Sequence, residues 1–245
     1  MAKCFGRKII INHNTPGIIT QYIQKQLQSD KRLSSLYADK FKGYNVIMGI
    51  DKLGTLSGIG VKLTTFEAFL AKVPNPEKWK LYQICFSDTY FPKKHDALKE
   101  SIISHAEKIN SKYSKAVELR FESLSMCEIL NILKEAKCFL ITSFRTNFQI
   151  FAFIYVYLCG YLERNKYIIA SEFTGIPKTL TTAIIINPYN IEKTVKILIE
   201  ISEDNGFENM DKIKCDYEQI GNNDVIKWGG ELIHDVIKVQ KRVFY

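Results

Sequence analysis

The chain has 245 residues, of which 46% are hydrophobic and 24% are charged, values typical of a folded, water-soluble domain. The net charge of +8 comes from lysines spread along the chain, and no nucleic-acid-binding motif accompanies them. We therefore expect a solvated basic surface and no nucleic-acid partner, and attraction to anionic ligands or acidic partners stays open.

Apolar runs of strand length alternate with helical patterns from residue 45 onward. Strands are predicted near 46–51, 81–86, 116–120, 138–142, 167–170 and 183–186. Helices are predicted near 63–70, 94–113, 125–136 and 149–160, and after Asn190, which is a suitable N-cap. This alternation predicts an α/β fold with a Rossmann-like parallel sheet and helices on both of its faces.

The last part of the chain departs from this pattern. Residues 1–222 are predicted to form one domain, and residues 223–245 a C-terminal helix with a weak point at Gly229–Gly230. Its apolar face comprises Val225, Ile226, Trp228, Leu232, Ile233, Val236 and Ile237. Such a face either packs on the chain's own sheet or docks onto a partner chain. The partner is favoured if the chain is one half of a larger fold.

The six cysteines form no CxxC pair and no cluster with histidine. Several lie inside apolar runs, such as Cys85 and Cys138, which indicates reduced core thiols of a cytoplasmic protein. A disulfide framework and a zinc site are the minor alternatives. The most apolar stretch, residues 148–162, is shorter than the roughly 20 residues that a bilayer requires, so we expect a buried helix and no membrane partner.

Parallel sheets bind ligands where the carboxyl ends of strands meet helix N-termini. The loops at 51–60 and 143–151 occupy such places in the predicted fold. The first contains three glycines but matches neither GxGxxG nor a Walker loop, so it indicates either a tight turn or a phosphate-binding loop.

These loops also carry a family resemblance. NVIMGIDKLGTLSGIGVKLTTFEAFL resembles the trehalose-6-phosphate synthase segment Gly-Val-Asp-Arg-Leu-Asp-Tyr-x-Lys-Gly-Ile and the helix after it. SFRTNFQIFAFIYV resembles Ser-x-Arg-Asp-Gly-Met-Asn-Leu-Val-x-x-Glu-Tyr-Val, and ASEFTG and AIIINPYN resemble further segments of that family. The resemblance runs in order from about residue 6 to 236.

The resemblance implies the C-terminal, nucleotide-sugar-binding half of a two-domain GT-B glycosyltransferase. Enzymes of that family transfer glucose from UDP-glucose to glucose-6-phosphate with retention of configuration and without a metal, so no cofactor is expected. The segment GRKIIINHNTPGI resembles the boundary between the halves, and the acceptor half is expected to be missing.

The implied donor-binding positions are strongly altered. The family's diphosphate-binding arginine and lysine correspond to Lys52 and Ser57, so one cation is kept without its bidentate fork and one is lost. The glucose-binding aspartate corresponds to Thr146, and the ribose-binding glutamate to Ile154. The intervening Gly-Met-Asn-Leu-Val is replaced by Asn147, Phe148, Gln149, Ile150 and Phe151.

Other positions match the family pattern, and we interpret them as shaping the fold: Arg145, Ser171, Glu172, Phe173 and Gly175. Residues 143–156 contain one charged side chain and no general acid or base, and the four histidines are isolated in the sequence.

We expect a protein linked to trehalose synthesis that is non-catalytic or regulatory, a subunit of a trehalose-synthesising complex that binds UDP-glucose weakly or not at all. The alternatives are the donor half of an active enzyme completed by a separate acceptor domain, and a decayed fragment.

Overall fold

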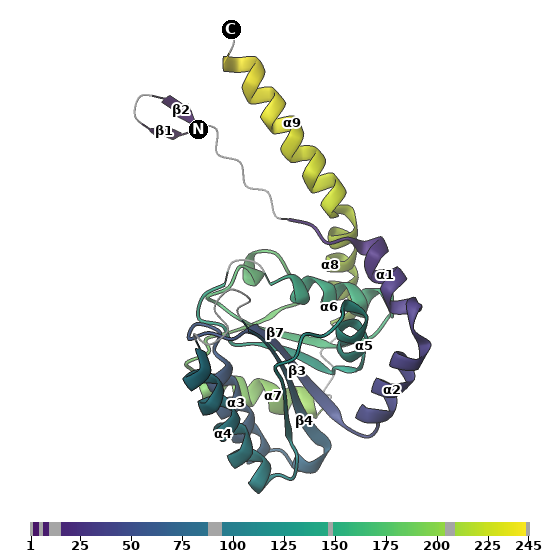
Figure 1. The fold of residues 1–245 in the computed structure, drawn as a ribbon, viewed down its shortest axis with the longest axis vertical. Coiled ribbons are helices and arrows are strands. Elements are labelled where there is room, and N and C mark those ends of the chain that lie inside the picture. Colours follow the sequence, from purple (N-terminus) through teal and green to yellow (C-terminus); the bar gives the residue numbers. More distant parts are fainter. Residues whose placement is uncertain are drawn as a thin grey trace.

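A parallel sheet forms the centre of the fold (Figure 1). It has six strands in the order β5-β4-β3-β6-β7-β8. The computed structural model describes residues 2–4, 7–9, 16–87, 95–146, 149–203 and 209–243. The strands are β3 (Asn45–Lys52), β4 (Trp79–Phe86), β5 (Val117–Arg120), β6 (Cys138–Ile141), β7 (Tyr167–Ser171) and β8 (Ile184–Ile186). Each lies within a few residues of its predicted position, and the parallel pairing is confirmed.

Helices cover both faces of the sheet, as predicted (Figure 1). One face carries α3 (Ile59–Leu70), α4 (Asp96–Lys112) and α7 (Ile191–Ser202). The other carries α1 (Thr20–Ser29), α2 (Lys31–Phe41), α5 (Met126–Glu135), α6 (Ile150–Tyr161) and α8 (Met210–Asn222). Short 3-10 turns occur at Pro76–Lys78 and Ile176–Lys178, and β1 (Ala2–Cys4) pairs antiparallel with β2 (Arg7–Ile9).

One strand contributes side chains to the hydrophobic cores on both faces of the sheet. Side chains of a strand alternate between the faces of a sheet. In β3, Val46, Met48 and Ile50 belong to the core beneath α1, α2, α5, α6 and α8, whereas Ile47 belongs to the core beneath α3, α4 and α7. A strand buried on both faces therefore reads as an uninterrupted apolar run.

Side-chain caps fix the start of several helices. Asn190 accepts a hydrogen bond from the backbone amide of Lys193, which confirms it as the N-cap of α7. Ser125 and Glu128 form a reciprocal capping box at the start of α5. These contacts satisfy amides that have no partner within the helix.

The terminal helix α9 (Val225–Val243) continues through Gly229 and Gly230 and projects away from the sheet (Figure 1). At its first turn, the Val225 amide donates to the Ile18 carbonyl of the body at 3.4 Å. Much of the predicted apolar face is solvent-exposed, at Ile226, Leu232, Ile233, Val236 and Ile237. Within the described chain, this face does not pack on the sheet.

Candidate functional site: a cavity at the carboxyl edge of the sheet

The strand order reverses between β3 and β6, so the connections on either side of this point leave in opposite directions. Ligands of open α/β sheets bind in the crevice that forms at such a point, outside the carboxyl ends of the strands. Both predicted ligand loops begin here, one after β3 and one after β6. They border a cavity of about 540 Å³.

Much of one wall comes from the β3–α3 loop, including Lys52, Gly54, Thr55, Leu56 and Ser57. The opposite wall comes from the β6–α6 connection and the start of α6. The described lining residues are Ile50, Asp51, Lys52, Leu53, Gly54, Thr55, Leu56, Ser57, Phe86, His95, Ser143, Arg145, Thr146, Gln149, Ile150 and Phe151.

The β3–α3 loop is held in one conformation by short polar contacts. The Ser57 hydroxyl donates to the Gly54 carbonyl at 2.6 Å, and the Phe144 amide donates to the Leu56 carbonyl at 2.9 Å. Gly58 has a φ of 71°, and a Cβ there would collide with the Thr142 carbonyl. A glycine is therefore required where this loop approaches the neighbouring strand before α3 begins.

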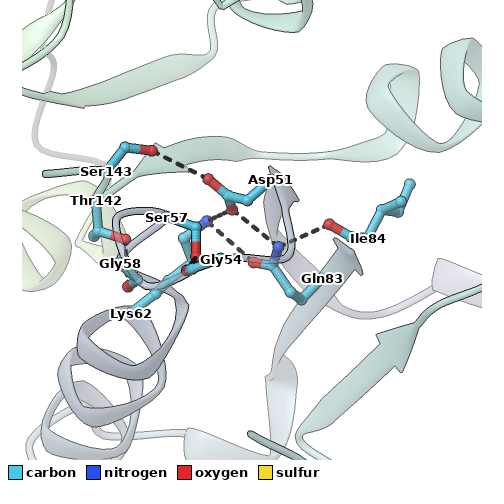
Figure 2. Close-up of polar contacts among 9 residues, drawn as sticks. All are labelled: Asp51, Gly54, Ser57, Gly58, Lys62, Gln83, Ile84, Thr142 and Ser143. Carbon is cyan, nitrogen blue, oxygen red and sulfur yellow. Dashed lines mark hydrogen bonds and ion pairs between the residues drawn. The ribbon is translucent and has the colours of Figure 1, made fainter. Parts of the chain in front are cut away.

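A buried polar network supports the cavity floor, which Asp51 and Ser143 line. Figure 2 shows its contacts. The Lys62 ammonium donates to Asp51 Oδ2 at 2.5 Å and to Gln83 Oε1 at 3.0 Å. Gln83 Nε2 donates to the same Asp51 oxygen at 2.9 Å, and Ser143 Oγ donates to Asp51 Oδ1 at 3.3 Å. The network joins α3, β3, β4 and the segment after β6, so it ties together the elements that frame the cavity.

Gly49 makes room for this network. A Cβ at that position would lie 2.6 Å from Lys62 Nζ and closer still to Gln83 Oε1. The glycine in the GID segment therefore has a packing reason, because the two long polar side chains occupy the space that a methyl group would take.

The structure brings together most of the residues singled out from the sequence. Lys52, Ser57, Thr146, Gln149, Ile150 and Phe151 all line the cavity. Ile154 does not: it lies one turn into α6, is 2% exposed and belongs to the core. Asn147 and Phe148 lie outside the described residues.

The charge balance of the described wall favours anions. Lys52 and Arg145 contribute cations, and His95 lies at the same cavity. Asp51 is the one acidic side chain among the described lining residues, and its carboxylate is neutralised by Lys62. The described wall therefore offers no carboxylate that is free to act as a general base or to accept a ribose hydroxyl.

An apolar patch completes the wall. The rings of Phe86 and Phe151 stack with centroids 5.7 Å apart and planes 19° apart. Cys85, next to Phe86 on β4, is buried, and this burial raises the pKa of its thiol to about 12. It is thus a protonated core thiol at neutral pH, as predicted for the cysteines in apolar runs, and not a nucleophile of the cavity.

The sequence interpretation missed Lys62, Gln83 and the place of His95. One signal for Lys62 was available: it is the charged residue within an otherwise apolar turn of IGVKLTTF, 11 residues after Asp51. A lysine on a buried helix face requires a partner.

Two further properties concern the described residues alone. Their His, Cys, Asp and Glu side chains form no group of three or more that could hold a metal ion. Their helices include none that is both long and apolar enough to cross a membrane.

Several known proteins are similar to this chain. The model of glycosyltransferase family 20 matches residues 1–238. The 56 kDa subunit of alpha,alpha-trehalose-phosphate synthase [UDP-forming] from Kluyveromyces lactis is 24% identical over 96% of this chain and 49% of its own length. The Dictyostelium discoideum synthase A is 30% identical over 69% of this chain and 23% of its own length.

Solved structures have the same fold. The N-terminal domain of Candida albicans trehalose-6-phosphate phosphatase superimposes with a TM-score of 0.85 and 26% identity, over 96% of this chain and 51% of that one. The Burkholderia multivorans synthase superimposes with a TM-score of 0.82 and 19% identity, over 98% of this chain and 53% of that one. The chain thus spans about half the length of the Kluyveromyces, Candida and Burkholderia proteins, and the match to the Dictyostelium protein covers about a quarter of that protein.

Proposed function

The chain belongs to glycosyltransferase family 20, and we propose that it is a trehalose-6-phosphate synthase-like subunit linked to trehalose synthesis that does not transfer glucose on its own. The proposal rests mainly on the burial and ion pairing of Asp51. It is the one carboxylate in the described cavity wall, and it is 3% exposed and paired with Lys62. A sugar donor would meet no available acidic partner there.

The positions inferred from the family resemblance point the same way. Ser57 has no cation to offset leaving-group charge, and its hydroxyl hydrogen is engaged by Gly54. Thr146 offers a hydroxyl in place of a carboxylate, and Ile154 lies in the apolar core. Loss of several preorganised charged contacts costs several kcal/mol of binding or transition-state stabilisation.

One comparison supports a role in an assembly, and another supports a role other than glucose transfer. The Kluyveromyces lactis relative is named as a subunit, and the Candida albicans neighbour is the N-terminal domain of a protein named for a phosphatase reaction. The same fold therefore occurs in a protein that is named for a different activity. The exposed apolar face of α9 provides a surface through which such a subunit could associate.

A second candidate function rests on the cations that the cavity keeps. Lys52 and Arg145 still line an open space of about 540 Å³. Because the chain covers about half of the Kluyveromyces lactis relative, this space could serve as the donor side of an active transferase completed by a separate acceptor domain.

A UDP-release assay with UDP-glucose and glucose-6-phosphate separates these functions. The chain is assayed alone and mixed with a separately purified N-terminal half of a family-20 synthase, with the intact synthase as the positive control. We expect no UDP release above background in either case. Release by the chain alone refutes the proposal, and release only in the mixture establishes the second function instead.

A further inference from the structure

An aromatic cluster lies at the carboxyl edge of the sheet, beside the cavity but outside its wall. The rings of Phe144 and Tyr189 stack with centroids 4.8 Å apart and planes 17° apart. Phe173 meets Tyr189 edge-on at 6.3 Å. The three residues come from the loops after β6, β7 and β8, which adjoin one another in the sheet.

This cluster is open to solvent. Tyr189 is 68% exposed and Phe173 is 42% exposed. Because Phe144 covers one face of the Tyr189 ring, a flat ligand can approach the other face without rearrangement of the cluster. Phe173, which the sequence interpretation assigned to shaping the fold, lies with much of its surface in solvent.

Polar groups surround the Tyr189 ring. An open hollow of about 490 Å³ is lined by Asn187, Tyr189, Asn190, Ile191 and Glu192. The side-chain oxygens of Asn187 and Asn190 accept from the amides of Tyr189 and Lys193, so both asparagines are held in fixed orientations. Within the described part of the chain, the side-chain nitrogens of both asparagines donate to no protein group, and the Glu192 carboxylate has no hydrogen-bond or ion-pair partner.

These features fit one class of ligand. One face of a pyranose ring presents C–H groups, which pack on the negative face of an aromatic ring, whereas its rim presents hydroxyls that both donate and accept. Tyr189 offers the ring face, Asn187 and Asn190 offer donors, and Glu192 offers an acceptor. None of these residues is a cation, and the carboxylate of Glu192 disfavours a phosphate or nucleotide at the hollow.

We infer that Phe144, Phe173 and Tyr189, with Asn187, Asn190 and Glu192, form a surface site for a neutral saccharide, separate from the cavity. The inference does not rest on the proposed function, because none of these six residues lines the cavity wall. This surface site would let the protein bind a sugar polymer or a free sugar whether or not the cavity binds a sugar nucleotide.

The test is saturation-transfer NMR of the full chain with maltoheptaose and, separately, with trehalose, followed by titration of whichever binds. We expect saturation of pyranose C–H protons and a Kd of about 1 mM. Tyr189→Ala should weaken binding about tenfold or more, the effect of about 1.4 kcal/mol, whereas Tyr189→Phe keeps the ring and should bind like the native chain.

Tyr22→Ala is the matched control, since Tyr22 is an exposed tyrosine on α1, on a different part of the molecule, and its loss should leave binding unchanged. Excess UDP should not displace the saccharide. Absence of saturation transfer from both sugars overturns the inference. So does a Tyr189→Ala variant that binds like the native chain, or displacement by UDP, which would move the sugar into the cavity.

Discussion

The buried ion pair beneath the cavity provides the sharpest test of how the site is built. Substituting Lys62→Met removes the ammonium while keeping most of the volume of the side chain. Asp51 then keeps Gln83 and Ser143 as donors but loses its counter-charge, at 3% exposure. Breaking a buried pair on one side typically costs about 3–5 kcal/mol, and the two remaining donors place this case near 3 kcal/mol.

Urea unfolding followed by circular dichroism measures this free energy directly. For a chain of this size, a loss of about 3 kcal/mol corresponds to a fall in Tm of about 6–12 °C. The double variant Asp51→Asn/Lys62→Met removes both charges and should recover more than half of the lost stability.

Lys112→Met is the control, because Lys112 pairs with Glu67 on the surface and is 64% exposed. It should leave the unfolding curve unchanged. A Lys62→Met variant that unfolds with the native midpoint, or a double variant less stable than the single one, would show that the pair does not hold the cavity floor.

Three further outcomes are expected. Asp216 is fully buried and accepts hydrogen bonds from the amides and hydroxyls of Thr181 and Thr182, which precede β8. Asp216→Asn should therefore lower the free energy of unfolding in urea by about 2–3 kcal/mol. Native-like stability of this variant would show that these hydrogen bonds do not stabilise the fold. In a Cys4→Ser variant at pH 8, a thiol reagent should modify Cys215 quickly and the buried thiols slowly, since burial raises the pKa of Cys85 to about 12; fast reaction of several thiols would disprove the described core. A chain ending at Asn222 should keep its Tm within a few degrees, because much of the described apolar face of α9 is exposed to solvent. Light scattering should then show loss of any self-association, and a large fall in Tm would show that α9 serves the chain's own core.

The sequence predicted the strands well because most of them are short apolar runs, whereas β5 alternates Val117 and Leu119 with Glu118 and Arg120. It did not predict α1, α2 or α8, whose sequences bury few side chains. Ile23 is the buried residue of α1, and Tyr37 and Phe41 are those of α2. Such sparse patterns are not distinguishable from polar loops without the sheet against which they pack.

The candidate site, like the fold, was predicted only in part. The two loops were predicted from their place after strands, and both line the cavity. Ile154 was assigned to the site by resemblance, but α6 begins at Ile150 and turns that side chain into the core. The network of Lys62, Gln83 and Asp51 depends on contacts between separate elements, which no local pattern specifies.

We propose that the cavity does not hold a sugar nucleotide in the manner of a family-20 synthase. Calorimetric titration of UDP-glucose into the full chain tests it most directly, with an intact synthase as the positive control. We expect a Kd weaker than about 1 mM for the chain, because Ser57, Thr146 and Ile154 supply no charge where the family resemblance implies it. A Kd of about 1 μM, equivalent to about −8 kcal/mol, would show that other residues of the cavity bind the sugar nucleotide tightly.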